Sequence, residues 1–255
     1  MSQQLPFELP RRDALGRDSF FVTTSNAAAL AMIETPDSWP EGRLVLTGPA
    51  GSGKSHLAHV WVAQMGARQR PAVGLRDADV PDLLHGPLCL EEAGAVAGDP
   101  AAEAALFHLL NLARARRRPV LMTHRSEPRA WGVQLPDLLS RLQASGLARL
   151  APPDDALLSA VLAKLFADRQ IVPAATVIPY LVSRMPRSFA AAAWLVADID
   201  HRALGTRGGA TRDKAQAALT ALEQRPEQGS EQGSEQGSEQ GPDRSKAQAG
   251  PPPRG

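Results

Sequence analysis

Cysteine and aromatic residues are scarce in this chain of 255 residues. Its one cysteine, Cys89, cannot form an internal disulfide, which excludes a disulfide-stabilised scaffold and favours a reducing compartment, the cytoplasm. Phe, Trp and Tyr together make up 4% of the residues, against 43% for all hydrophobic types. We therefore expect a core built mainly from Leu, Val, Ala and Ile.

The sequence also lacks an excess of charge of either sign and a long apolar run. It has 28 basic and 27 acidic residues, so no overall positive field points to bulk nucleic-acid binding. No stretch approaches the roughly 18 apolar residues of a membrane span. The N-terminal segment has no apolar run of the kind found in signal peptides. We expect no association with membranes.

Short apolar runs alternate with helical patterns up to about residue 152. Strands are predicted at 43–47, 72–75, 87–91 and 119–123, and helices at 25–35, 56–65, 101–117 and 136–144. Such alternation predicts an α/β fold with a parallel sheet flanked by helices on both faces. Beyond it the pattern is helical only, with helices predicted at 154–169, 174–185 and 187–204 and a further short one considered at 211–223.

These patterns divide the chain into four segments. Residues 1–12 are predicted to be extended, 13–152 to form the α/β domain, and 153–205 to form a small helical domain. Residues 206–255 are of low complexity and include tandem Glu-Gln-Gly-Ser repeats. A polar repeat without apolar residues cannot offset its ordering entropy, so we expect this tail to be mostly disordered.

The segment between the first predicted strand and its helix fits the phosphate-binding pattern G-x(4)-G-K-[ST]. In that pattern backbone N–H groups turn towards phosphate oxygens, and the helix start adds a favourable dipole. Lys54 would supply a charge to the phosphates, and Ser55 a hydroxyl to Mg²⁺. The alternative is a glycine-rich turn that merely precedes a helix. The candidate nucleotide-binding residues here are Gly48, Pro49, Ala50, Gly51, Ser52, Gly53, Lys54, Ser55 and His56.

A phosphate site of this kind needs an acidic element to hold Mg²⁺ and to polarise water. Glu91 and Glu92 follow the strand Leu88–Leu90 and are the candidates, Glu91 for the metal and Glu92 for catalysis. The usual first residue is Asp, and Mg²⁺ demands tight octahedral geometry. The longer Glu91 is therefore expected to weaken metal binding. The alternative is a solvated pair of acids at a strand end.

Taken in order, the motifs resemble those of the DnaA-related AAA+ family and, within it, the Hda regulatory proteins. The likeness covers about residues 3–205 and rests on QLPF, GPAGSGKSH, LEEAGAVAG, LPDLLSRLQASGL and RMPRSF. It implies a P-loop AAA+ parallel sheet, a small α-helical lid domain, and ADP or ATP as cofactor, with Mg²⁺ as an additional ligand.

The resemblance also implies roles for individual residues. Arg141 matches the arginine finger that reaches a neighbouring subunit's nucleotide; the alternative is an ordinary arginine at a helix end. Arg187 matches the second-sensor arginine; the alternative is a salt bridge within the helical bundle. Thr123 lies where the first sensor is expected, but Arg125 stands where relatives often carry an acid. His124 is interpreted as a partly exposed histidine at a strand end; the alternative is a general base.

The N-terminal Gln4, Leu5, Pro6 and Phe7 resemble the short peptide by which such proteins dock on the DNA polymerase sliding clamp. An extended segment with a polar anchor and apolar plugs suits that role, and proline lowers its ordering cost. The alternative is a flexible terminus with chance apolar residues.

The favoured hypothesis is a regulator of replication initiation that binds adenine nucleotide, docks on the sliding clamp (the beta subunit of DNA polymerase III) and stimulates ATP hydrolysis by DnaA. One alternative is a stand-alone DnaA/DnaC-like ATPase that acts as a loader or remodelling factor. Another is a non-enzymatic adaptor that uses the nucleotide only to stabilise its fold. Assembly with further copies of the chain is left open. Low-complexity sequence follows the lid where DnaA has a helix-turn-helix domain, so we expect no direct sequence-specific DNA binding.

Overall fold

A computed structural model describes residues 11–12, 20–203 and 209–225, and every structural statement below refers to these residues. The predicted clamp-binding peptide, Gln4–Phe7, and the tandem repeats of the tail lie outside them.

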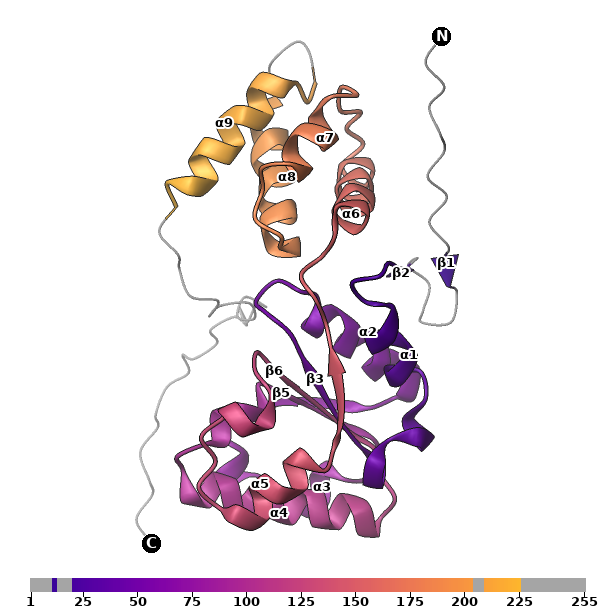
Figure 1. The fold of residues 1–255 in the computed structure, drawn as a ribbon, viewed down its shortest axis with the longest axis vertical. Coiled ribbons are helices and arrows are strands. Elements are labelled where there is room, and N and C mark those ends of the chain that lie inside the picture. The colour runs from indigo at the N-terminus through magenta and orange to yellow at the C-terminus, as the bar shows by residue number, and fades with distance from the viewer. Residues whose placement is uncertain (1–10, 13–19, 204–208, 226–255) are drawn as a thin grey trace, which may run out of the picture.

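The centre of the molecule is a five-stranded parallel sheet in the order β4-β5-β6-β3-β7 (Figure 1). The strands are β3 (Arg43–Thr47), β4 (Arg68–Pro71), β5 (Leu88–Glu91), β6 (Val120–His124) and β7 (Gly146–Arg149). Every adjacent pair in this sheet is parallel, which confirms the fold class predicted from the alternating pattern. The carboxyl ends of all five strands therefore lie along one edge.

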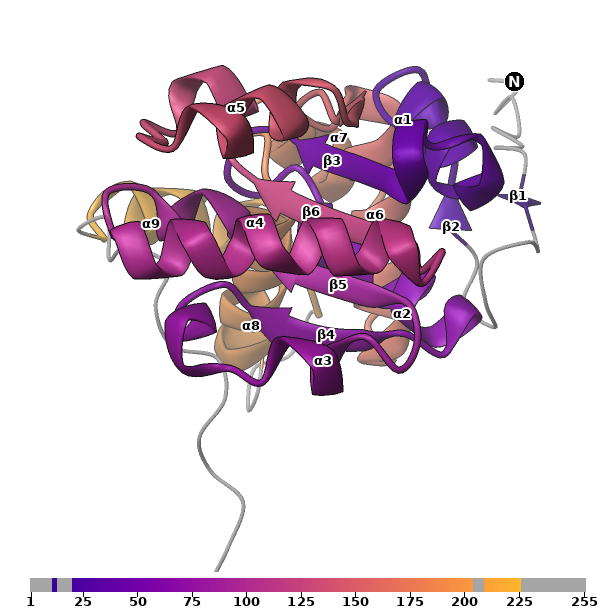
Figure 2. The same cartoon turned by 90° about the horizontal axis from the view of Figure 1, so that it is seen from below.

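Helices cover both faces of the sheet. Their bounds are α1 (Ala27–Ile33), α2 (Lys54–Met65), α3 (Val80–Leu83), α4 (Pro100–Ala115) and α5 (Pro136–Gln143). Because side chains alternate along a strand, Val45 packs in the core with α3, α4 and α5, whereas Leu44 and Leu46 pack in the core with α1 and α2. Seen from below, α4 and α5 cross in front of the sheet (Figure 2).

The remaining helices form a separate layer above the carboxyl edge of the sheet (Figure 1). They are α6 (Asp155–Asp168), α7 (Val177–Val182), α8 (Phe189–Ala203) and α9 (Arg212–Glu223). This lid has its own apolar core, to which α9 contributes Ala215, Ala218 and Leu219. The helical domain thus extends past its predicted boundary at residue 205, because the apolar face of α9 is buried against α7 and α8.

Two strands of the sheet differ from the prediction. The strand expected at 72–75 is wrong: β4 ends at Pro71, and Ala72 and Leu75 are buried in the turn that follows it. Strand β7 was not predicted at all. Both are edge strands, and their sequences, RQRP and GLAR, carry no apolar run. A small antiparallel pair, β1 (Arg11–Arg12) with β2 (Phe20–Phe21), was also not predicted.

The structure also describes the surroundings of the single cysteine and the length and apolarity of the helices. Cys89 is fully buried in β5, and burial, with a smaller effect from Glu91, raises the pKa of its thiol to about 12. The thiol is therefore unreactive at neutral pH.

None of the helices in the described ranges combines the length and apolarity needed to cross a bilayer.

Glu103 is a buried carboxylate that ties α4 to the loops on either side of it. Its side chain is 2% exposed and accepts hydrogen bonds from the backbone N–H groups of Gly98 (3.0 Å), Gln134 (3.0 Å) and Leu135 (2.7 Å). Burial alone would raise the pKa of Glu103, but these three donors outweigh it, and the pKa is lowered. The ionised form is therefore the one that stabilises the fold.

We predict that Glu103→Gln lowers the free energy of unfolding at pH 7 by about 1–3 kcal/mol. The side-chain NH₂ of glutamine would face backbone N–H groups, which are donors too, so at least one hydrogen bond would be lost. A lowered pKa gives stability that is present above the unfolded-state value and lost as the pH falls through the folded-state value. The difference between the two proteins should therefore shrink below about pH 4. Urea unfolding at several pH values measures it, with the exposed Glu223→Gln as control. Equal stability at pH 7 would contradict the assigned role.

Candidate nucleotide-binding site

The predicted phosphate loop joins the end of β3 to the start of α2, the arrangement that the motif requires. Gly51 (φ +73°) and Gly53 (φ +94°) adopt left-handed conformations that favour glycine. The lid also approaches closely here: a Cβ on Gly51 would lie 2.1 Å from Ser188 Oγ, and one on Gly53 would lie 2.8 Å from Phe189 Cε2. The backbone N–H of Phe189 donates to Gly51 O at 3.1 Å. The lid thus packs directly on the loop, which the motif alone did not indicate.

Lys54 begins α2 and is 7% exposed. Its Nζ donates to the carbonyl oxygens of Gly48 (2.8 Å) and Pro49 (2.9 Å). Burial lowers the pKa of Lys54, Glu92 opposes this shift, and the charge of Arg125 adds to it. The ammonium is therefore held in place by two carbonyl oxygens of the phosphate loop.

A cavity of about 1250 Å³ lies between the carboxyl edge of the sheet and the lid. Most of the predicted site residues line it: Ala50, Gly51, Ser52, Gly53, Lys54, Ser55, His56, Glu91, Glu92 and Thr123. Gly48 and Pro49 belong to it only through their bonds to Lys54. The fold thus gathers residues from three separate stretches of sequence into one site.

Glu92, one of the acidic pair, is in contact with the predicted first sensor, Thr123. The backbone N–H of Glu92 donates to Thr123 Oγ1 at 3.2 Å, and Glu92 has a left-handed φ of +50°. Its Oε2 lies 3.1 Å from Nδ1 of His124, whose ring meets Trp131 edge-on. Burial lowers the pKa of His124, and Glu92 opposes the shift. The contact between Glu92 and His124 was not predicted, since His124 was interpreted only as a partly exposed histidine at a strand end.

The donors around the cavity fit a polyphosphate and a hard cation. Ser52 Oγ is buried and has no hydrogen-bond partner, so it offers an unused hydroxyl beside the loop. The oxygens of Ser55 and Glu91 are the kinds that Mg²⁺ prefers. Within the part of the chain that the structure describes, no group of three or more His, Cys, Asp or Glu side chains could hold a metal. A cation held by Ser55 and Glu91 would therefore also need phosphate and water ligands.

Arg187, the predicted second sensor, stands just before α8 but does not line this cavity. Its Nη1 lies 2.7 Å from Asp155 Oδ1 and donates to Pro153 O at 3.3 Å. The alternative interpretation, a salt bridge within the helical domain, describes its position in this structure.

Arg141, the predicted trans finger, lies near the end of α5 and outside the cavity. Its guanidinium stands 4.9 Å from the centre of the Phe107 ring, a cation–π contact with α4. Glu41, which acts together with Arg141 on the charge of the buried Arg43, is paired with Arg43 and with Arg114. No carboxylate of the described residues forms an ion pair with Arg141. The guanidinium of Arg141 thus packs on an aromatic ring and is not neutralised by a carboxylate of the described residues.

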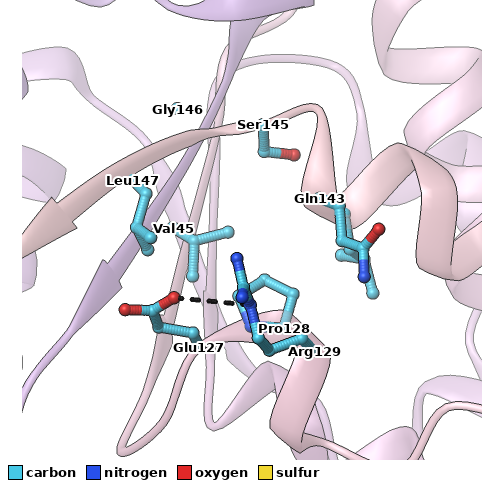
Figure 3. Close-up of a pocket in the computed structure, with 9 residues that line it drawn as sticks. Val45, Glu127, Pro128, Arg129, Gln143, Ser145, Gly146 and Leu147 are labelled. Atoms are coloured by element: carbon cyan, nitrogen blue, oxygen red, sulfur yellow. Dashed lines mark ion pairs between the residues drawn. The ribbon is translucent and has the colours of Figure 1, made fainter.

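A second, smaller cavity of about 360 Å³ lies beside the end of α5 and the edge strand β7 (Figure 3). Val45, Gln143 and Ser145 surround it, and an ion pair between Glu127 and Arg129, 3.8 Å, lies at its side. It contains no residue of the phosphate loop and no pair of acids of the kind found at Glu91 and Glu92. The cavity at the P-loop is therefore the candidate nucleotide site.

Comparison with known proteins supports this geometry at the level of the fold. No family model matches the chain. Domain III of the replication initiation protein DnaA from Thermotoga maritima matches with a TM-score of 0.67 at 18% identity, over 79% of this chain and 94% of that one. AMPPCP-bound DnaA from Aquifex aeolicus matches with 0.61 at 17%, over 72% and 64%. The Holliday junction branch migration motor RuvB from T. maritima matches with 0.58 at 15%, over 71% and 61%.

The chain therefore has the fold of domain III of DnaA, a five-stranded parallel sheet flanked by helices. It spans nearly all of that isolated domain but less than two thirds of the longer DnaA and RuvB chains.

We predict that Lys54→Ala lowers the affinity for ADP by about 10- to 100-fold, the size expected for losing charged hydrogen bonds to phosphate. Titration of the purified chain with a fluorescent ADP analogue measures this. Lys214→Ala, on α9 and outside the cavity, is the matched control and should bind like the wild type. An unchanged affinity in a folded Lys54→Ala protein would contradict the phosphate site.

Proposed function

We propose that this protein binds adenine nucleotide in the cavity at the P-loop and limits the initiation of chromosome replication by stimulating ATP hydrolysis in DnaA. The observation that carries the proposal is the separation of two cations. Lys54 lines the protein's own cavity, whereas Arg141 stands outside it on the α4–α5 face. One cation suits a bound nucleotide, and the other suits a nucleotide held by a partner.

Nucleotide binding rests on the loop, the ammonium of Lys54 and the unused hydroxyl of Ser52. Ser55 and Glu91 would hold Mg²⁺, which would supply positive charge to offset the negative charge of the phosphates. The ligand is an adenine nucleotide, ADP or ATP; the fold likeness to AMPPCP-bound DnaA supports the base, which no residue of the loop reads.

Arg141 is the residue proposed to act on the partner. A guanidinium is permanently charged and matches the oxygens of a transferring phosphoryl group. Stacking on Phe107 restricts the side chain, which lowers the entropy lost when it docks. Glu41 is already paired with Arg43 and Arg114, so a local acid does not compete with the partner's phosphate. These contacts support a finger supplied in trans, in the manner of the Hda regulators.

The protein's own hydrolysis is proposed to be slow. Glu92, the candidate for polarising water, lies 3.1 Å from the ring of His124. Glu91 is one methylene longer than the usual aspartate, which suits the tight geometry of Mg²⁺ less well. The nucleotide then serves mainly to hold the lid and the sheet in a state that DnaA recognises.

Clamp docking is assigned to Gln4, Leu5, Pro6 and Phe7 on the basis of their sequence. We propose that this segment binds the sliding clamp, so that the protein acts on DnaA where replication has begun.

We predict that Arg141→Ala lowers the stimulation of DnaA ATP hydrolysis by about 10³-fold, the lower end of what a trans arginine supplies in GTPases. Binding of ADP by the variant should stay unchanged, because Arg141 does not line the cavity. Hydrolysis by ATP-loaded DnaA in the presence of DNA-loaded clamp is the assay. Arg129→Ala, an exposed arginine beside the second cavity, is the control. Normal stimulation by Arg141→Ala would mean that Arg141 is not the finger.

We also predict that replacing Gln4 and Leu5 together with Ala removes clamp binding while nucleotide affinity is kept. Binding to immobilised clamp and titration with ADP measure the two properties separately. The assignment of the peptide fails if the double variant still binds the clamp as tightly as the wild type.

A stand-alone ATPase of the DnaA/DnaC type is the second candidate, because the backbone N–H of Glu92 donates to Thr123 Oγ1, which brings the candidate catalytic acid and the predicted first sensor together. Steady-state ATP turnover by the purified chain separates it from the regulator. A non-enzymatic adaptor, the third reading of the fold, would neither turn over ATP nor stimulate DnaA.

A further inference from the structure

A group of arginines lies at the amino edge of the sheet, which is the edge away from the lid (Figure 1). Arg43 begins β3 and pairs in register with Val120, the first residue of β6. The run 114–118, which contains four arginines, joins the end of α4 to this strand. A Cβ on Gly42 would lie 3.8 Å from the backbone oxygen of Arg118, so the run passes beside the start of β3.

Glu41 is the carboxylate that pairs with this group. It forms ion pairs with Arg43 and, at 3.3 Å, with Arg114. Arg43 is 1% exposed, and its Nε and Nη1 atoms have no hydrogen-bond partner. Burial lowers the pKa of Arg43 most strongly, Glu41 opposes the shift, and the charges of Arg141 and Arg114 add to it. Positive charge is therefore in excess between the ends of α4 and α5.

Two arginines of the run are exposed and unpaired. Within the chain as the structure describes it, the side chains of Arg117 and Arg118 form no hydrogen bond or ion pair. The dipole of α4 favours a cation in its last turn, which explains Arg114, but Arg117 and Arg118 follow the C-cap residue Arg116. We call Arg114, Arg117, Arg118 and Arg141 the arginine surface.

A second group of cations lies on the lid. The guanidinium groups of Arg184 and Arg212 stand 4.3 Å and 4.9 Å from the centre of the Tyr180 ring. This group has two arginines, whereas the arginine surface has four, so the arginine surface attracts an acidic segment more strongly.

Negative charge is concentrated in the tail. Residues 227–243 contain no lysine or arginine, and their acidic residues are Glu227, Glu231, Glu235, Glu239 and Asp243. The near-neutral charge of the whole chain is thus the sum of this acidic segment and a basic remainder. Gln, Gly and Ser stand between the repeated acids and supply no apolar anchor, so a contact made by this segment would depend on charge.

The tail is long enough to reach the arginine surface. It follows Arg225, at which the described part of the chain ends, and residues 226–243 span up to roughly 60 Å when extended. A compact body of about 200 residues is roughly 40 Å across. Because the segment belongs to the same chain, its effective concentration at the surface is on the order of millimolar. Each guanidinium can donate two parallel hydrogen bonds to one carboxylate.

We propose that residues 227–243 dock on the arginine surface of the same chain and pair their carboxylates with its guanidinium groups. The inference does not depend on nucleotide, on DnaA or on the clamp. Where Arg141 acts as the trans finger, the docked segment covers it and has to be displaced by the partner.

The test places a nitroxide spin label in the tail of the full chain and measures the broadening of backbone amide NMR signals. Ser238→Cys supplies a thiol that is labelled selectively, because Cys89 is buried and the pKa of its thiol is raised to about 12. We expect the signals of residues 114–118 to lose about half or more of their intensity at low salt and to recover it at about 1 M salt, where the Debye length is about 3 Å.

Variants on both sides of the contact separate charge from proximity. The loss of intensity should disappear when four carboxylates are removed together by Glu227→Gln, Glu231→Gln, Glu235→Gln and Glu239→Gln. The four corresponding Asp substitutions keep the charge and should preserve the loss. Arg117→Asn with Arg118→Ser should reduce it; Asn suits position 117, where φ is +52°.

Four outcomes would overturn the inference and leave the proposed function standing. Signals of residues 114–118 that are not broadened would show that the tail does not dock there. Equal broadening in the four-Gln variant or at high salt would show that charge is not the cause. Broadening centred on Arg184 and Arg212 would place the tail on the lid. Broadening that appears only when a spin-labelled chain is mixed with an isotope-labelled one would show that the contact joins two copies.

Discussion

The site depends on one buried charge at the junction of a strand and a helix. An ammonium that is 7% exposed is costly unless it is partnered, and Lys54 is partnered by the carbonyl oxygens of its own loop. Because parallel strands end at one edge, β6 and β5 bring Thr123 and the acids to the same place. The order of strands in the sheet, not closeness in sequence, assembles the site.

The lid completes this arrangement from above. Ser188 and Phe189 lie so close to Gly51 and Gly53 that any side chain on either glycine would have to displace them. The glycines of the motif therefore serve two purposes, an inward turn of the backbone and the approach of the lid. A shift of the loop on binding phosphate would therefore displace the start of α8, which lies beside Arg187 and its partner Asp155.

Much of the fold could be predicted from local signals. The strand 43–47, the loop and the helix after it combine an apolar run, glycines and helical spacing, and the structure has all three. The edge strands β4 and β7 could not be predicted, because RQRP is polar, GLAR has only two apolar side chains, and both strands owe their conformation to a neighbouring strand. The packing of α9 on the lid depends on contacts with α7 and α8 that a short amphipathic segment does not reveal by itself.

In the candidate site, too, some features could be predicted from the sequence and others could not. Residues within the motif could be named from sequence, since their spacing is set by the loop. Contacts between separate elements could not: Phe107 beneath Arg141, His124 beside Glu92 and Asp155 against Arg187 all depend on tertiary packing. Arg125 stood out in the sequence only as a departure from the family pattern, and the strand register gives it a place beside the phosphate loop.

The central claim is that the wild-type chain carries a polyphosphate site at the junction of β3 and α2. Isothermal titration calorimetry of the purified, folded protein with ADP tests it most directly. The account predicts saturable binding with one nucleotide per chain; the absence of any binding heat over a range of temperatures, with the protein folded throughout, would contradict it.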